Sequence, residues 1–180
     1  IELYAGLYYH VIWLFVLIVV VQSNRAAIDS SGNLHSKNTI GHVLLFFIIF
    51  YMGTRPVNFR FGDMLLYALD FNQMKLGIHA PKDLAFYLVT VFSVKFLNMP
   101  LYFLLCAILY VLPLYFFAKR VFKEYWFYAF FMLVLSFSFW TYGVNGIRNG
   151  IATSMFLLAI SYDKPFVVVG LCILSILFHK

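Results

Sequence analysis

The chain has 180 residues, of which 64% are hydrophobic, 21% aromatic and only 11% charged. About a quarter of the residues in soluble domains are charged, so this composition excludes an ordinary soluble domain and predicts an integral membrane protein. The net charge of +6 does not indicate nucleic-acid binding, because the cations stand singly between apolar runs and form no basic face. A bias of loop cations toward the cytoplasmic side explains that charge better.

The first half of the chain contains two predicted spans. Residues 3–21 are apolar except for His10 and are long enough to cross the hydrocarbon core of a bilayer. A polar loop is expected over residues 22–39. It is followed by a short span at 40–53, which would need local membrane thinning or extension into its flanks. Residues 54–81 form the longest polar stretch, and we expect a loop there that carries function.

The second half is expected to contain the remaining apolar helices. Residues 84–97 are short and interrupted by polar side chains, which favours an interfacial or re-entrant helix. Full spans are predicted at 101–118, after a proline in the first turn, and at 126–144. A break rich in glycine and asparagine then precedes a shorter helix at 151–162, and a last span begins at residue 166 after a tight turn.

These segments predict an all-α, multi-pass transmembrane helical bundle. It would contain about six hydrophobic helices, one of them short, broken or re-entrant. Residues 1–180 would form a single transmembrane domain. Because the chain starts with Ile1 and ends close to an apolar segment, we expect it to be a fragment of a longer polytopic protein.

Loop cations predict the orientation of the bundle. Lys119, Arg120 and Lys123 form the strongest cytoplasmic marker. Alternation from this cluster places residues 54–97 and the break around Arg148 on the outer side. Arginines on that side run against the usual bias, so we expect an anionic ligand to hold them there.

Arg148 is the most informative residue of the chain. It lies between two apolar runs and is flanked by Gly146 and Gly150. A guanidinium at membrane depth is costly unless an anion or water receives it. Glycines would loosen the helix here, and the exposed N–H groups could then join Arg148 in binding a phosphate or carboxylate. The alternative is that the glycines only let helices approach closely, and pairing of Arg148 with a neighbouring acid would count against the ligand hypothesis.

Other candidate residues lie beyond the second predicted span and at the end of the chain. Arg55 and Arg60 carry guanidinium forks that suit phosphate, although snorkelling to the headgroups is the alternative for Arg55. Asp63 is either a functional carboxylate or a solvated loop residue. His179 closes an apolar helix, where a structural or interfacial role is the alternative to a catalytic one. The chain shows no metal-ligand spacing, and we predict neither a metal nor a cofactor.

Four short motifs carry a resemblance to a known family. They are Gly53-x-Arg55, Gly62-Asp63 with Tyr67 four residues on, Asn145-x-x-Arg148 at the start of a helix, and a helix ending in Leu177-Phe178-His179-Lys180. Together they resemble the EpsG family of Wzy-type polysaccharide polymerases, over essentially the whole chain. Asn149 stands where that family usually has glutamine after the arginine, and Gly62-Asp63 lacks the usual intervening residue.

The resemblance implies a glycosyltransferase of the bacterial cytoplasmic (inner) membrane. Such an enzyme polymerises oligosaccharide repeat units carried on undecaprenyl diphosphate, on the outer side of the membrane, into exopolysaccharide, capsule or O-antigen. Its implied partners are the lipid-linked donor and acceptor, the lipid bilayer, and a chain-length regulator with other polysaccharide-export proteins. No nucleic acid is among them.

The resemblance also implies roles for individual residues. The diphosphate, on which negative charge develops as the glycosidic bond breaks, would be bound by Arg55, Arg60 and Arg148. A proton would pass from the acceptor hydroxyl to one of two candidate bases, Asp63 or His179. The sugar rings would be bound by Tyr67, Tyr142 and Asn145.

Two other functions remain open from the sequence. A transporter or flippase for a lipid-linked glycan or another anion could use the broken helix around Arg148 as its substrate site. A membrane acyltransferase that modifies a glycan could use His179 as its base.

Overall fold

The computed structural model describes residues 9–17, 20–21, 33–58, 61–78 and 83–179. Within these ranges the regular structure is helical and no strand is present, as the all-α prediction requires. The chain divides into two compact units, Ile1–Phe47 and Ile48–Lys180. The second unit holds every candidate site residue that the structure describes, whereas the single transmembrane domain over residues 1–180 stays a prediction.

The first two predicted spans are helical where the structure describes them. Residues 9–17 and 20–21 lie in the first span and are helical. Helix α2 (Asn33–Gly53) has 21 residues, so the second span extends into its flank, as its short apolar stretch predicted. The loop expected at 22–39 is therefore wrong for residues 33–39, and residues 22–32 lie outside the described part of the chain.

A helix lies inside the polar stretch that was expected to be a loop. Helix α3 (Met64–Lys75) buries Met64, Tyr67, Ala68 and Phe71. These positions follow the i, i+3, i+4, i+7 spacing of one helix face. The first six residues of α3 are all apolar, and its leucines lie on the exposed side, so an apolar run long enough for a helix lies inside the stretch read as polar. The expectation of a continuous loop over residues 54–81 is wrong for this reason.

Helices α4 and α5 follow in the order that the sequence predicted. Helix α4 (Leu84–Phe96) has 13 residues, about 20 Å at 1.5 Å per residue, so it is a short helix as expected. Helix α5 (Met99–Phe122) is capped by Asn98, whose side chain accepts a hydrogen bond from the Leu101 N–H at 3.0 Å. In the described residues, one segment, Met99–Leu135, is long and apolar enough to cross a membrane. The count of about six spanning helices stays a prediction.

The span predicted over residues 126–144 is two short helices. After α5, the 3₁₀ turn η2 (Lys123–Tyr125) reverses the chain, and α6 (Trp126–Leu135) packs back against α5. The Ser136 hydroxyl donates to the Leu133 carbonyl at 2.7 Å and accepts from the Phe139 N–H at 3.2 Å. Ser136 thus ends α6 and caps α7 (Phe137–Val144), because a serine hydroxyl competes for backbone hydrogen bonds.

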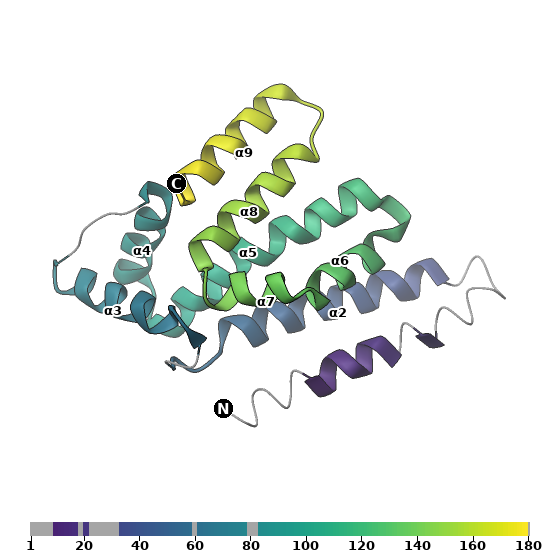
Figure 1. Cartoon of the computed structure of the whole chain (residues 1–180), viewed down its shortest axis with the longest axis horizontal. Helices are drawn as coiled ribbons and strands as arrows, with labels where there is room; N and C mark the ends of the chain where they lie inside the picture. The colour runs from purple at the N-terminus through teal and green to yellow at the C-terminus, as the bar shows by residue number, and fades with distance from the viewer. Residues whose placement is uncertain (1–8, 18–19, 22–32, 59–60, 79–82, 180) are drawn as a thin grey trace. The chain divides into compact units, whose positions relative to one another are not determined.

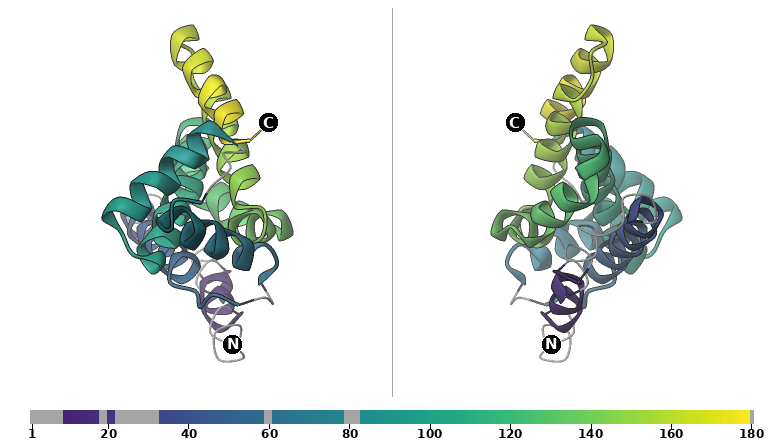
Figure 2. Two further views of the ribbon diagram at one scale, coloured as in Figure 1. Left: turned by 90° about the vertical axis from the view of Figure 1, so that its left-hand side faces the viewer. Right: turned by 90° about the vertical axis from the view of Figure 1, so that its right-hand side faces the viewer.

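Two antiparallel helices complete the second unit. Helix α8 (Ile147–Ile160) packs against both α5 and α9 (Pro165–Phe178), and α8 and α9 lie side by side in Figures 1 and 2. The turn between them lies at the predicted Asp163-Lys164-Pro165 segment. The Ser175 hydroxyl donates to the Ala152 carbonyl at 2.7 Å and so joins the two helices.

Gly150 lies where α8 meets the end of α7. A Cβ atom added to Gly150 would lie 2.8 Å from the Tyr142 carbonyl oxygen. The glycine therefore allows a close approach of two helices, which is the alternative weighed above. Helix α8 continues through Gly150, so the expectation that this glycine loosens the helix is wrong. The predicted break lies instead at residues 145–146.

The Gly150 contact makes a testable prediction about stability. Gly150→Ala should destabilise the protein by about 1–3 kcal/mol, because its methyl group would press on a backbone carbonyl that cannot move freely. Gly170→Ala is the matched control in α9, since a Cβ there meets nothing within 4 Å, and its helix propensity should improve by up to about 1 kcal/mol. Thermal unfolding of both variants in detergent measures the difference, and equal stability of the two would contradict the contact.

Candidate functional site

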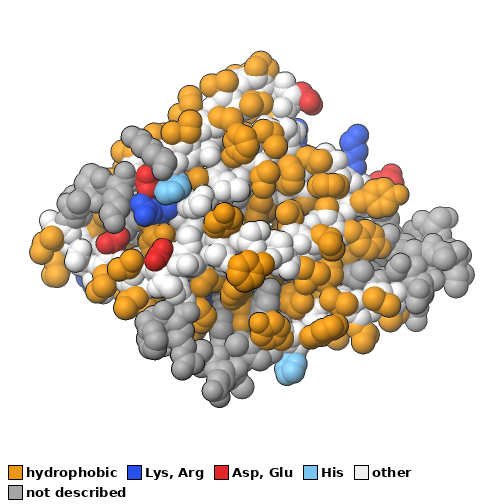
Figure 3. Space-filling model, viewed as in Figure 1, with side chains coloured by type: hydrophobic (Ala, Val, Ile, Leu, Met, Phe, Trp, Pro, Cys, Tyr) orange, Lys and Arg blue, Asp and Glu red, His pale blue; other side chains and the backbone are white. Residues whose placement is uncertain are grey.

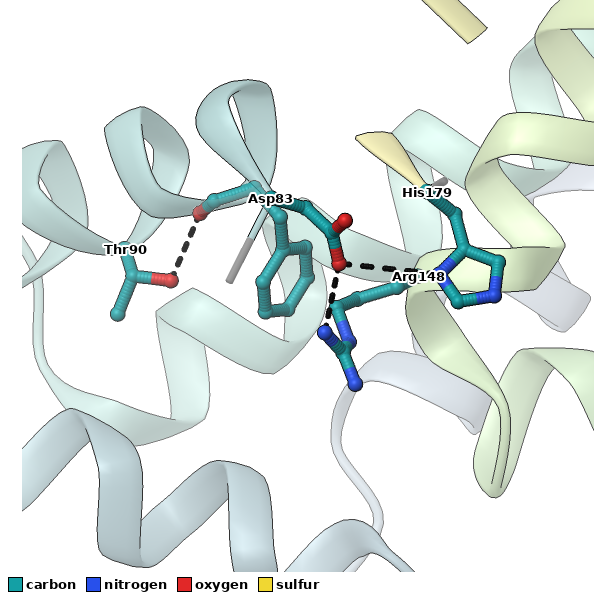
Figure 4. Close-up of polar contacts among 5 residues, drawn as sticks. Asp83, Thr90, Arg148 and His179 are labelled. Atoms are coloured by element: carbon teal, nitrogen blue, oxygen red, sulfur yellow. Dashed lines mark hydrogen bonds and ion pairs between the residues drawn. The ribbon is translucent and has the colours of Figure 1, made fainter. Parts of the chain in front are cut away.

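Three helix ends bring charged or titratable side chains together. Arg148 Nη1 donates to Asp83 Oδ2 at 2.6 Å, and His179 Nδ1 lies 3.7 Å from the same oxygen (Figure 4). The exposed fractions of these side chains are 6% for Asp83, 26% for Arg148 and 39% for His179. We call these three residues the Asp83 cluster. Figure 3 shows basic, acidic and histidine side chains gathered on a largely apolar face.

The helix packing explains why these three residues meet. Asp83 directly precedes α4, Arg148 is the second residue of α8, and His179 directly follows α9. Because α8 and α9 are antiparallel neighbours, the start of α8 lies beside the end of α9. Helix α4 also contacts α9, which brings Asp83 to the same place.

The bond between Asp83 and Arg148 compensates the burial of the Asp83 carboxylate. A buried carboxylate is costly without a partner, and a charge-assisted bond from a guanidinium is short and stronger than a neutral one. A guanidinium has five N–H donors, and the bond to Asp83 uses one of them. Arg148 can therefore bond to Asp83 and still offer donors to a ligand.

Tyr67, from helix α3, also interacts with Arg148. Its ring lies edge-on to Phe86, with 5.5 Å between the centroids, and it is 6% exposed. Burial raises the pKa of Tyr67, while its hydrogen bond with Arg148 and the charge of Arg148 act in the opposite direction. The predicted role of Tyr67 was sugar binding, but its burial favours a contact with Arg148 over stacking on a sugar ring.

Asn145 and Asp63 lie next to one another across the fold. The Asn145 Oδ1 atom accepts a hydrogen bond from the Asp63 backbone N–H at 2.7 Å. Gly62 adopts a φ of +61°, and a Cβ on Gly62 would lie 2.6 Å from Cγ of Asn145. The Asp63 side chain is exposed, and its charge contributes to the raised pKa of Tyr67. Asn145, which was predicted to bind sugar, thus holds the start of α3.

The other predicted site residues lie in different environments. Arg55 is 4% exposed, donates to the Met52 carbonyl and has its guanidinium 5.4 Å from the centroid of the Phe103 ring. This burial leaves little of its surface for a ligand, so the predicted binding of diphosphate by Arg55 stays a prediction. Arg60 lies outside the described residues. Tyr142 lies in α7 and is partly exposed.

Asp83 is the site residue that the sequence analysis missed. An acid directly before an apolar run is a typical helix-capping signal, which would have drawn attention to it. Its side chain nevertheless makes no capping hydrogen bond to α4, and its carboxylate is directed to Arg148. This pairing is the outcome that was expected to count against the ligand hypothesis for Arg148, and a ligand there must compete with Asp83.

The fold and the Asp83 cluster define a class of protein. The chain is highly apolar, its described residues include a segment long enough to cross a bilayer, and charged side chains meet at its helix ends, so it is a membrane protein. Within the described ranges, no group of three or more histidine, cysteine and acidic side chains could hold a metal ion.

The chain belongs to the EpsG family. The model of that family matches residues 43–180, a range that includes all four motifs on which the resemblance was based. This match confirms the family that the sequence motifs predicted. No curated protein and no solved structure matches the chain.

The Gly62–Asn145 contact makes a second testable prediction. Gly62→Ala and Gly77→Ala both place a side chain at a positive φ, but a Cβ at Gly77 meets nothing within 4 Å. Gly77→Ala should lower the free energy of unfolding by about 1 kcal/mol through backbone strain alone. Gly62→Ala should lose a further 1–2 kcal/mol or so because it displaces Asn145 from the Asp63 N–H. Thermal unfolding of the two variants tests this order, and equal losses would contradict it.

Proposed function

We propose that the protein is a membrane glycosyltransferase that polymerises oligosaccharide repeat units carried on a lipid diphosphate. Membership of the EpsG family supports a Wzy-like polymerase. The observation that carries the proposal is the Asp83 cluster, in which a partly exposed arginine and a partly exposed histidine share one buried carboxylate oxygen. This combination supplies a cationic group for a diphosphate and a base for an acceptor hydroxyl within one site.

The position of the cluster along α8 agrees with the proposed outer-side chemistry. Arg120 Nε donates to the Ser161 carbonyl at 3.2 Å, and the Arg120 guanidinium lies 3.7 Å from the centroid of the Tyr162 ring. Arg120, one of the cations predicted to mark the cytoplasmic side, therefore lies at the C-terminal end of α8. Arg148 lies 13 residues before Ser161, or roughly 20 Å along a helix. If Arg120 faces the cytoplasm, the Asp83 cluster faces the opposite surface.

Arg148 would bind the diphosphate of the donor. Negative charge develops on the leaving diphosphate as its bond to the sugar breaks, and a guanidinium stabilises that charge most in the transition state. Tyr67 is packed against Phe86 and interacts with Arg148, so the arginine is held in place before the ligand arrives. Arg55 is left out of this role because it is buried against Phe103.

His179 is the proposed base. Its Nδ1 atom faces Asp83, which leaves Nε2 to accept the proton from the acceptor hydroxyl. The hydroxyl oxygen then bonds to the anomeric carbon of the donor sugar, and the bond from that carbon to the phosphate oxygen breaks with its electron pair. The products are a longer glycan, a lipid diphosphate and a protonated His179. Asp63 is the second candidate base, since its carboxylate is exposed near Tyr67.

A transporter or flippase is the second candidate function. The break at residues 145–146 between α7 and α8 favours it, because transporter substrate sites often use interrupted helices. Purified protein in detergent with lipid-linked repeat units separates the two functions. A polymerase should elongate the glycan without a bilayer, whereas a transporter should leave its length unchanged.

The roles of Arg148 and His179 make a third testable prediction. Arg148→Ala should lower the elongation rate by about 10²–10³-fold, the usual effect of removing one electrostatic stabiliser. Arg148→Lys should retain only part of the wild-type elongation rate, since an ammonium lacks the planar fork. His179→Ala should lose about 10²–10⁴-fold, as expected for a general base.

The matched control for these variants is Lys75→Ala, which removes an exposed cation at the end of α3. It should elongate at the wild-type rate. Gel analysis of products from lipid-linked repeat units measures all four variants. Normal chain length from both Arg148→Ala and His179→Ala would remove the basis of the proposal.

A further inference from the structure

Asp83 uses its carboxylate in an unusual way for a residue at the start of a helix. It directly precedes α4, yet its side chain makes no capping bond there. A free α4 N-terminus would offer N–H groups to that carboxylate. The carboxylate instead lies 2.6 Å from Arg148 Nη1 and 3.7 Å from His179 Nδ1. Its position is therefore explained by these two partners and not by the helix it precedes.

A single oxygen, Oδ2 of Asp83, faces both partners. At 2.6 Å, Arg148 Nη1 makes a charge-assisted hydrogen bond to this oxygen. At 3.7 Å, His179 Nδ1 lies beyond hydrogen-bond length. The carboxylate is thus bound to Arg148 and only close to His179. Figure 4 shows both side chains directed toward Asp83 from different helices.

A carboxylate and a phosphate compete for the same guanidinium. Each can present two anionic oxygens to the N–H fork. Any diphosphate that binds Arg148 must therefore displace Asp83 or share the guanidinium with it. A displaced Asp83 carboxylate remains buried and needs another cationic or donor partner, and His179 is the partner already within 4 Å.

We propose that Asp83 is a positioning residue that exchanges Arg148 for His179 when a lipid diphosphate binds. Without a ligand, Asp83 neutralises Arg148. When the diphosphate takes over Arg148, Asp83 pairs with Nδ1–H of His179. This exchange rests on the proposed function and adds a coupling to it: donor binding prepares the base.

The exchange accounts for the proton in the transfer step. A hydrogen bond from Nδ1–H to Asp83 fixes the neutral tautomer whose Nε2 lone pair accepts the acceptor proton. The resulting imidazolium then faces the Asp83 carboxylate, which stabilises its positive charge. The Tyr67 hydroxyl of α3 also interacts with Arg148, and the charge of Asp63 acts on Tyr67. Neither group replaces Asp83 beside Nδ1 of His179.

Asp83→Asn tests the exchange because the amide keeps the size of the side chain and removes its charge. Arg148 would lose its competitor, so the variant should bind inorganic pyrophosphate about tenfold more tightly, as expected when a binding-competent state rises from a tenth of the population to nearly all of it. The turnover number of elongation should fall by roughly 10²-fold or more, because His179 loses the group that orients it. Calorimetry in detergent and the elongation assay measure the two quantities.

Opposite changes in pyrophosphate affinity and turnover are the outcome that a purely structural role would not produce. If both fell together, or if neither changed, the exchange would be wrong. Asp70→Asn is the matched control, an exposed acid of α3, and should change neither quantity. Arg148→Ala should abolish the pyrophosphate signal and so show that binding occurs at this residue.

The wild-type protein provides a second test that does not depend on the folding of Asp83→Asn. Addition of pyrophosphate should shift the ring nitrogen signals of His179 in ¹⁵N NMR, assigned by their loss in His179→Ala. Unchanged His179 signals at saturating pyrophosphate would overturn the exchange. Failure of the wild type to elongate lipid-linked repeat units would instead overturn the proposed function, and the pyrophosphate measurements would still decide the exchange.

Discussion

The ion pair between Asp83 and Arg148 is the interaction on which the polar end of the second unit depends. A buried carboxylate is unfavourable in apolar surroundings without a cation beside it, and removal of one partner leaves the other uncompensated. Both residues lie at the start of a helix, so their bond at 2.6 Å ties α4 to α8. His179 faces the same oxygen from the end of α9. Packing of the helices brings these three ends together, and the bond to Arg148 compensates the carboxylate that is buried where they meet.

Local signals predicted much of the fold. The start of α5, with proline in its first turn, and the turn before α9 are each set by a few adjacent residues, and each lies where the sequence predicted it. A break between α7 and α8 was also predicted, but it lies at residues 145–146 and leaves Arg148 inside α8. Helix α3 was missed because its short apolar run, residues 64–69, lies inside a stretch whose flanks are polar and charged. The end of α6 was missed because the single hydroxyl of Ser136 interrupts an otherwise apolar run, and average hydrophobicity does not register it.

The candidate site could be predicted only in part, because its contacts join distant positions. Arg148 and His179 stood out as polar residues in apolar surroundings. Asp83 did not, since its bond to Arg148 crosses 65 positions and depends on how α4, α8 and α9 pack. The surroundings of Arg55 were also not predicted, because its contact with the Phe103 ring joins positions far apart in the sequence. Residue type predicted which side chains need a partner, and tertiary packing decided which partner each one has.

A neutralised arginine has an advantage at the membrane surface. Phospholipid headgroups surround any site at that depth, and an unpaired guanidinium would bind their phosphates without discrimination. Specificity is a difference of affinities, and a built-in competitor rejects weak ligands more than strong ones. A phosphodiester offers one negative charge, as the Asp83 carboxylate does, and gains little by displacing it. A diphosphate offers more than one charge on adjacent phosphates and can displace Asp83 from Arg148. On the proposed function, the internal ion pair would therefore select the lipid diphosphate from a large excess of ordinary phospholipid.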